Sequence, residues 1–250
     1  MEKIDLDHLT IVLHRPRYPE NIGAAARAMR NMGVRRLSVV EPRDCDLNKI
    51  LKLATHGAMD VIENMAVHDN LSEALSSFNY VVGTTARLGG QRRVVITPSK
   101  LGEHLISFSG NNRIAIVFGP EDRGLTNEEI RYCHLMVTIP TAEFSSLNLS
   151  QAVMVICYEL LQADRKQGGG YAPRLASRHE LDGMYEQLKS VLIKISFINP
   201  ENPDYWMNNL RQFFNRHQLR AKEVRIVRGI CRQIDWYGEK CFTDGLKKKD

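Results

Sequence analysis

The segment HRPRYPENIGAAARAMRNMG, residues 14–33, begins where a short apolar run ends and passes through a turn containing Pro and Arg into a helical pattern of small residues. Two later segments have the same layout, IVFGPEDRGLT at 116–126 and IPTAEFSSLNLSQAV at 139–153. Each joins an apolar run to a polar turn and the start of a helix. Because the carboxyl ends of parallel strands meet at one edge of a sheet, where α/β proteins bind their ligands, the three segments predict one shared site.

Short β-branched runs alternate with helical patterns along the first 160 residues. This alternation predicts an α/β fold with a mostly parallel sheet that helices cover on both faces. Thr126 and Glu129 have the spacing of a capping box at the start of one helix. Strands are expected at 10–13, 37–40, 80–83, 114–118 and 136–139. Helices are expected near 22–32, 46–59, 71–77, 98–107, 126–134 and 147–164.

A Gly-rich segment separates this part of the chain from a helical remainder. It reads DRKQGGGYAPRLASR from residue 164, and its three consecutive glycines and its proline are typical of a linker. The sequence therefore predicts a domain over 1–164, a linker over 165–178 and a helical extension over 179–250. Within the extension, two helices are expected, near 179–196 and 205–237.

The net charge of +5 is concentrated in the helical remainder. Residues 171–250 carry 15 Lys and Arg against 10 Asp and Glu, whereas the first 170 residues carry 19 of each kind. A localised basic surface favours a polyanion such as RNA as a partner. A solvated basic face that serves only solubility fits the charge equally well, so charge alone leaves both interpretations open.

Several protein classes are disfavoured by what the sequence lacks. No apolar run approaches the roughly 20 residues that span a bilayer, and no signal peptide is expected at the N-terminus. Five scattered cysteines without a CxxC pair indicate unpaired thiols in a reducing cytoplasm. No strand is followed by GxGxxG, the glycines at 119 and 124 lack the lysine of a P-loop, and no GxSxG elbow occurs. The spacing of His and Cys predicts no metal site.

Taken together, the three segments resemble the motifs of a known enzyme family. PENIGAAARAM, VFGPEDRGL and IP…SSLNLSQA are similar, in order and spacing, to the three motifs of the SpoU-type (SPOUT) RNA ribose methyltransferases. The resemblance covers roughly residues 8–165. With GTTAR at 83–87 and the helical extension, the chain looks most like the TrmJ branch of that family.

The resemblance implies a fold, a reaction and partners. The fold is a parallel-sheet SPOUT domain whose C-terminal part forms a trefoil knot, a rare exception to unknotted topology. The reaction is methyl transfer from S-adenosylmethionine to a ribose 2′-oxygen in the tRNA anticodon loop, with S-adenosyl-L-homocysteine as product and no metal. The partners are tRNA and a second copy of the chain in a homodimer, with the active site near the subunit interface. Two alternatives stay open, 2′-O-methylation of rRNA and a non-catalytic RNA-binding relative.

Backbone N–H and C=O groups can hold the adenosine of such a donor, because glycines and small residues at strand exits allow close approach. By position and resemblance, the expected cofactor contacts are Thr84, Thr85, Ala86, Gly119, Ile139, Ser146, Leu147 and Asn148. Gly119 and Gly124 can also be required by a tight turn with positive φ, and both explanations can hold together.

Arg27 is the expected substrate-activating residue, because the family assigns this arginine to the reacting hydroxyl. It lies on the first helix, four residues after Gly23. Removing a proton from a guanidinium at neutral pH costs about 7–9 kcal/mol. We therefore expect Arg27 to orient the hydroxyl and stabilise the forming alkoxide rather than to act as a general base. The structural alternative is an ion pair with a surface carboxylate.

Three further residues are expected at the catalytic site, each with a structural alternative. Asn21 contacts the substrate or caps its helix. Glu121 supports the catalytic arginine or the RNA ribose, or is simply a carboxylate in a turn. Ser146 takes part in the reaction or is the N-cap of the helix that starts near residue 147.

Two groups of arginines are expected to contact RNA phosphates, which position a nucleic acid without reading its sequence. The first group, in a Gly-rich loop that can alternatively be merely solvated, is Arg87, Arg92 and Arg93. The second group, on one helix face that can alternatively pack against the partner subunit, is Arg225, Arg228 and Arg232.

Overall fold

The computed structural model describes residues 4–86, 95–144, 146–164 and 174–247. Contacts divide the chain into two compact units, Met1–Arg174 and Leu175–Asp250. The division falls within the Gly-rich segment expected to be a linker, of which residues 165–173 lie outside the described residues. Each unit is described by itself.

The first unit is built on a parallel sheet. Among the described residues the sheet has seven strands in the order β3-β2-β1-β6-β4-β7-β5, and every neighbouring pair is parallel. The residues of β1 and β6, near the centre of the sheet, are all buried, as expected for strands covered on both faces. The strands are β1 (Leu9–His14), β2 (Arg36–Val40), β3 (Ala66–His68), β4 (Tyr80–Thr84), β5 (Val95–Ile96), β6 (Ile114–Phe118) and β7 (Leu135–Val137).

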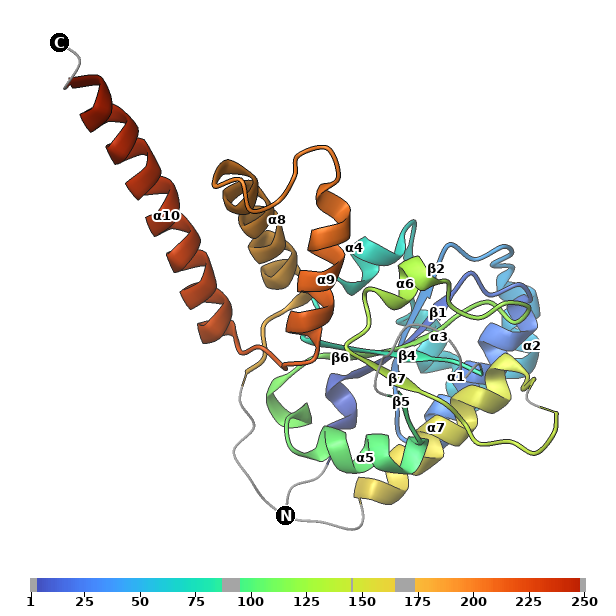
Figure 1. Cartoon of the computed structure of the whole chain (residues 1–250). Coiled ribbons are helices and arrows are strands. Elements are labelled where there is room, and N and C mark those ends of the chain that lie inside the picture. Colours follow the sequence, from blue (N-terminus) through green and yellow to red (C-terminus); the bar gives the residue numbers. More distant parts are fainter. Residues whose placement is uncertain (1–3, 87–94, 145, 165–173, 248–250) are drawn as a thin grey trace. The chain divides into compact units, whose positions relative to one another are not determined.

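Helices lie on both faces of this sheet (Figure 1). They are α1 (Pro19–Asn31), α2 (Leu47–Ala54), α3 (Met59–Glu63), α4 (Leu71–Leu75), α5 (Pro98–Ile106), α6 (Asn127–Ile130) and α7 (Leu149–Asp164), with short 3-10 turns η1 (Leu6–His8), η2 (His56–Ala58) and η3 (Ser109–Asn111). α1, α5 and α7 cover one face, and α4 and α6 cover the other. The α/β architecture predicted from the alternation of strands and helices is confirmed, and the trefoil knot stays a prediction.

Some element boundaries differ from the sequence prediction. The single helix expected over 46–59 is divided into α2, η2 and α3, because Thr55 adopts a positive φ of 56° that ends α2. The edge strands β3 and β5 have no counterpart in the prediction, because runs of three and two residues are too short to show alternation. Ile139 lies beyond β7 rather than in it, since that strand ends at Val137.

Gly23 has a packing role in α1. A Cβ atom at this position would collide with the carbonyl oxygen of Ile50 in α2. Only glycine therefore allows the two helices to approach so closely. The contact holds α1, the helix that carries Asn21 and Arg27, firmly against α2.

The second unit is helical, with α8 (Arg178–Lys194), α9 (Pro203–Asn215) and α10 (Ala221–Lys247). The single helix expected over 205–237 is wrong, because the chain leaves helical geometry between α9 and α10. In that break the Arg220 N–H donates to the Glu223 carboxylate at 2.8 Å, and Leu175 pairs with Arg220 as an antiparallel bridge. The buried core of the unit comprises Ala176, Leu181, Met184, Tyr185, Ile198, Met207 and Val224.

Candidate active site

A cavity of about 280 Å³ opens at the carboxyl ends of β4, β6 and β7. Four stretches of chain line it: the exit of β4, the turn after β6, the segment after β7 and the first turns of α7. Its lining residues are Thr84, Thr85, Ala86, Phe118, Gly119, Pro120, Glu121, Asp122, Arg123, Gly124, Leu125, Val137, Ile139, Ser146, Leu147, Leu149 and Ala152. Adjacent strands of a parallel sheet deliver these stretches to one edge, as the three segments predicted.

The lining contains all but one of the residues expected to contact a cofactor. Those present are Thr84, Thr85, Ala86, Gly119, Ile139, Ser146 and Leu147. Asn148 is the exception, because it lies at the start of α7 and points its side chain elsewhere. Seven of the eight residues expected to contact a cofactor thus lie together at one cavity, and their contact with a cofactor stays a prediction.

The exit of β4 is fixed by hydrogen bonds to both neighbouring strands. The Thr84 hydroxyl donates to the carbonyl of Val117 in β6 at 3.1 Å, and the Thr85 N–H donates to the carbonyl of Val137 in β7 at 2.9 Å. These contacts hold the floor of the cavity without using a charged group.

Two glycines make the turn after β6 possible. Gly124 has a φ of 67° and donates its N–H to the Pro120 carbonyl at 2.9 Å. A Cβ atom on Gly119 would collide with the backbone of Gly124 and Leu125. The positive-φ explanation therefore holds for Gly124, whereas Gly119 is required by close backbone approach, which also leaves its main chain open to the cavity.

Hydrogen bonds connect the three sequence segments directly. The Asn21 side-chain amide donates to Glu121 Oε1 at 2.8 Å, and the Asn148 amide donates to Asn21 Oδ1 at 3.0 Å. The second carboxylate oxygen of Glu121 accepts the Arg17 N–H at 3.1 Å. Asn21 does not cap its helix, because α1 begins at Pro19 after Tyr18 and lacks a side-chain cap. Glu121 is more than a turn carboxylate, since it joins two segments about a hundred residues apart.

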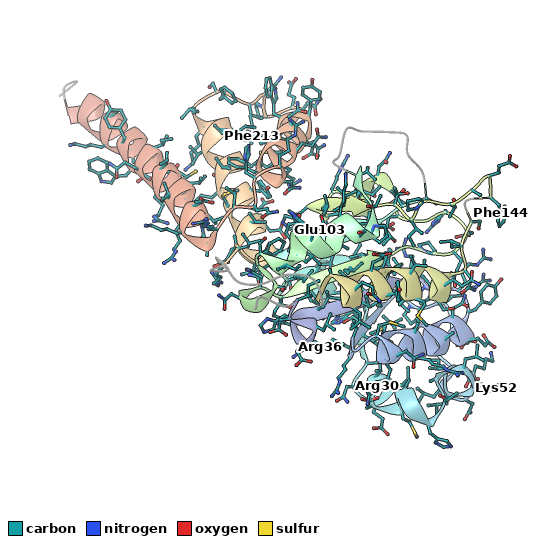
Figure 2. The ribbon with its side chains drawn as sticks, turned by 90° about the horizontal axis from the view of Figure 1, so that it is seen from below. Arg30, Arg36, Lys52, Glu103, Phe144 and Phe213 are labelled. Atoms are coloured by element: carbon teal, nitrogen blue, oxygen red, sulfur yellow. The ribbon has the colours of Figure 1, made fainter. Side chains whose placement is uncertain are left out.

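Asn148 also caps α7. Its Oδ1 accepts the Ser150 N–H at 2.9 Å and the Ser150 hydroxyl at 2.7 Å, and the Gln151 side chain accepts the Asn148 N–H at 3.4 Å. The cap proposed for Ser146 is therefore wrong, because Asn148 has that role and α7 begins one residue later. Ser146 is left exposed on the wall of the cavity, with its hydroxyl available to a ligand. Phe144, two residues earlier and 80 % exposed, extends from the same loop (Figure 2).

Arg27 lies outside this cavity. It is exposed in a second, open groove of about 600 Å³ between α1 and α7, which is lined by Ala24, Arg27, Ala28, Asn31, Leu53, Ser150, Gln151, Met154 and Val155. The first turns of α7 separate the groove from the cavity, because Ser150 and Gln151 line the former and Leu149 and Ala152 the latter. No carboxylate in the described residues forms an ion pair with Arg27, so the surface-pair alternative is not found there.

The arginines expected to contact RNA are only partly described. Arg87, Arg92 and Arg93 lie outside the described residues. In the second unit, Arg228 Nε donates to Gln187 Oε1 of α8 at 3.2 Å, so this residue helps join α10 to α8. Arg225 and Arg232 are exposed on α10.

Charged residues at the end of β1 have no counterpart in the sequence prediction. His14 Nε2 lies 2.9 Å from Glu129 Oε1, and Arg17 Nη1 donates to Asp122 Oδ2 at 2.8 Å. Burial raises the pKa of the Glu129 carboxyl, but hydrogen bonds from the Thr126 N–H and from His14 outweigh it and lower that pKa overall. The only sequence signal for this set is that a histidine ends a mostly apolar strand.

Neither metal ligation nor a membrane span is found in the described part of the chain. No three His, Cys, Asp or Glu side chains are grouped there so as to hold a metal ion. No helix there combines the length and apolarity needed to cross a membrane.

Two family models match the chain, one for each unit. Residues 8–158 match the SpoU rRNA Methylase family, and residues 179–244 match the C-terminal domain of the tRNA methyltransferase TrmJ. The chain belongs to the SpoU methylase family, in its TrmJ branch. The family resemblance carried by the three sequence segments is thus confirmed, together with the helical part that follows them.

TrmJ proteins match the chain over most of its length. The tRNA (cytidine/uridine-2'-O-)-methyltransferase TrmJ of Pectobacterium atrosepticum is 37% identical over 241 residues, which cover 92% of this chain and 97% of that protein. The tRNA (cytidine/uridine/adenosine-2'-O-)-methyltransferase TrmJ of Pseudomonas aeruginosa is 37% identical over 245 residues, covering 90% and 93%. The crystal structure of TrmJ from Z. mobilis ZM4 superposes with a TM-score of 0.78 at 30% identity, covering 90% of this chain and 98% of that one.

Proposed function

We propose that this protein transfers a methyl group from S-adenosylmethionine to the 2′-oxygen of a ribose in the anticodon loop of tRNA, leaving S-adenosylhomocysteine. The observation that carries the proposal is a pair of hydrogen bonds at Asn21, which donates to Glu121 and accepts from Asn148 and so joins all three family segments beside one cavity. Full-length relatives with this activity in their names support the tRNA substrate. Since tRNA is processed in the cytoplasm and all five cysteines are free, we place the protein there.

The lining of the cavity suits the donor's adenosine chemically. Leu125, Val137 and Ile139 provide apolar walls, and Gly119 leaves its backbone accessible where any side chain would collide. Thr84, Thr85, Ala86, Ser146 and Leu147 would complete the contacts. When bound, S-adenosylmethionine supplies an electrophilic methyl group on its sulfonium, so these residues need only bind and orient it.

On the acceptor side, the residues of the chain orient a ribose and favour loss of its proton. Ser146 presents a hydroxyl on the cavity wall, and Glu121 is held rigidly by Asn21 and by the Arg17 N–H. Arg27 supplies the positive charge that stabilises the forming alkoxide. This cation needs access to the cavity from the groove on the far side of the first turns of α7.

A homodimer provides that access. The α1–α7 groove is open and combines apolar side chains, among them Leu53, Met154 and Val155, with Arg27. We infer that a second copy covers this face and that Arg27 of each copy acts at the cavity of the other. The active site near a subunit interface, expected from the family, then follows from the separation of Arg27 from its own cavity.

The second unit would dock the tRNA. Its excess of Lys and Arg, with Arg225 and Arg232 exposed on α10, suits phosphate contacts. Arg87, Arg92 and Arg93 are proposed for the same role. The name of the family matched by residues 8–158 keeps rRNA as a second candidate substrate, whereas residues 179–244 match a TrmJ domain and favour tRNA.

The test is methylation of defined RNAs by the purified protein, with the products mapped by nucleoside mass spectrometry. We expect 2′-O-methylated nucleosides in the anticodon loop of tRNA and none in rRNA fragments. Calorimetry should show donor binding in the low-micromolar range, roughly 7–8 kcal/mol. Donor binding without methylation of any RNA would contradict the proposed reaction, and methylation of rRNA alone would move the assignment to the second candidate.

A further inference from the structure

A buried histidine ends β1 and contacts a helix far along the chain. His14 is 2 % exposed, and its Nε2 lies 2.9 Å from Glu129 Oε1. Glu129 belongs to the capping box of α6, where its other carboxylate oxygen accepts the Thr126 N–H at 2.7 Å. The capping box needs only one carboxylate oxygen, so the contact with His14 is additional to the requirements of α6.

Strained backbone follows directly after this histidine. Arg15 and Glu41 have φ angles of 51° and 48°, in a region that residues other than glycine rarely adopt. The Arg15 side chain holds both places together: its Nε and Nη2 donate to Glu41 Oε2 at 2.8 and 2.6 Å, and its Nη1 lies 3.6 Å from Glu129 Oε1. Strain of this kind persists where the surrounding contacts impose it, and it clusters at functional sites.

His14 is an unfavourable choice for stability alone. Its Nδ1 is buried and has no hydrogen-bond partner in the described part of the chain. A buried polar atom without a partner weakens a fold, whereas an aliphatic residue would fill the end of a buried strand without that cost. A residue that breaks a local rule in this way is expected where function requires it. Since the Glu129 carboxyl is ionised, the Nε2–H of His14 donates to it.

The segment between His14 and Asn21 is held by hydrogen bonds at three successive residues, Arg15, Pro16 and Arg17. The Arg15 N–H donates to the Val40 carbonyl at 2.7 Å, the Pro16 carbonyl accepts the Arg43 N–H at 3.2 Å, and the Arg17 N–H donates to Glu121 at 3.1 Å. α1 then starts at Pro19, so Asn21 lies in its first turn. A displacement of His14 therefore moves this constrained segment, and with it the side-chain amide of Asn21 that joins the three segments.

We propose that His14 and Glu129 are positioning residues for methyl transfer, which hold the end of β1 so that Asn21 meets Glu121 and Asn148. This role presupposes the reaction proposed above. His14 lines neither the donor cavity nor the groove of Arg27, so its effect on turnover can be measured separately from donor binding. Loss of its contact should therefore reduce turnover while donor binding is kept.

The experiment compares three variants of the full chain. His14→Leu removes the contact, His14→Gln places an amide N–H near the position of Nε2, and Thr126→Val weakens the capping box without touching His14. We expect His14→Leu to lower kcat about tenfold or more, with the donor Kd changed less than about twofold, because small misplacements at a reacting centre have effects of this size. His14→Gln should recover most of the loss, and Thr126→Val should lower Tm with kcat nearly unchanged.

Two results would overturn the positioning role. The first is that the kcat of His14→Leu is no lower than that of Thr126→Val when the two variants have equal Tm. The second is that His14→Gln loses as much kcat as His14→Leu. Should His14→Leu fail to fold, Glu129→Gln tests the same contact, since glutamine keeps a capping box but presents an amide to His14. A wild-type protein without turnover would contradict the methyltransferase proposal instead. If the wild type has no turnover, a crystal structure of His14→Leu tests the positioning role separately. An intact Asn21–Glu121 hydrogen bond in that structure refutes the role, and loss of the bond supports it.

Discussion

The cavity at the strand exits, proposed to bind the donor, and the α1–α7 groove lie on two sides of the first turns of α7, but they are built in different ways. The cavity is made of turns held by backbone hydrogen bonds, of small residues, and of Glu121, whose carboxylate accepts a partly buried hydrogen bond from the Asn21 amide. The groove is larger in volume and more open, is lined by side chains of regular helices, and leaves Arg27 exposed. One chain thus supplies the whole of the proposed binding site for the donor. Arg27, the cation proposed to act on the acceptor ribose, needs a second copy of the chain to reach a cavity.

The largest expected effect comes from Arg27→Ala. Loss of a positive charge that stabilises a developing alkoxide should reduce kcat by about 10²–10³. Donor affinity, measured by calorimetry, should stay within about twofold, because Arg27 does not line the cavity. Arg30→Ala is the matched control: this arginine of the same helix, labelled in Figure 2, pairs with Asp60 at the surface, where ion pairs contribute little. Equal loss of activity in both variants would mean that Arg27→Ala impairs the enzyme only by disturbing α1, and not by removing a charge that acts on the reaction.

Gly119→Ala, unlike Arg27→Ala, should impair donor binding as well as turnover. Its Cβ would collide with the backbone of Gly124 and Leu125, and such strain costs roughly 2–3 kcal/mol. We expect donor affinity to fall about 100-fold, with turnover falling in parallel. Gly110→Ala, where a Cβ meets no atom within 4 Å, should leave both unchanged. Undiminished donor affinity in Gly119→Ala would place the donor elsewhere.

Mixed dimers test whether cavity and groove from different copies cooperate. Arg27→Ala and Ser146→Ala chains, each nearly inactive alone, are co-purified as heterodimers by two affinity tags. If Arg27 acts at the cavity of the partner, one of the two sites in each heterodimer is intact. Activity should then return to about half that of the wild type, since sites act independently when they share no group. Heterodimers as inactive as the parents would show that Arg27 serves its own chain.

The smallest effect is expected in the second unit. Arg225→Gln with Arg232→Gln should weaken tRNA binding about fivefold and reduce the slope of log affinity against log salt by about 1.5, as expected for two lost phosphate contacts. Arg228→Gln is the control, because its loss of the bond to Gln187 should lower Tm and leave the slope nearly unchanged. If the slope is the same for all variants, Arg225 and Arg232 do not contact phosphates and serve only solubility.

Local patterns predicted the parts of the molecule that depend on residues close in sequence. The central strands, the Thr126–Glu129 capping box and the turn containing Gly119 were all accessible in this way, since each follows from alternation, capping or glycine spacing. Parallel pairing then brought the expected cavity residues together, because strand exits share an edge.

What the sequence could not predict depends on geometry between distant residues. Asn148 rather than Ser146 caps α7, and both fit the pattern until the first helical residue is known. His14 and Glu129 lie 115 residues apart in the sequence, so no periodic pattern of residues indicates their contact. Arg27 was expected to act on the substrate because the family assigns this arginine to the reacting hydroxyl. It lies six positions after Asn21, and six positions along a helix turn a side chain by about 240°, onto another face.

The most direct measurement is a crystal structure of the protein with S-adenosylhomocysteine bound. The product should occupy the cavity between the exit of β4, the Gly119–Gly124 turn and Leu147, with Ser146 beside it and Arg27 contributed from the neighbouring copy. A nucleoside bound at another surface, or strand exits too far apart to touch the same molecule, would contradict the account.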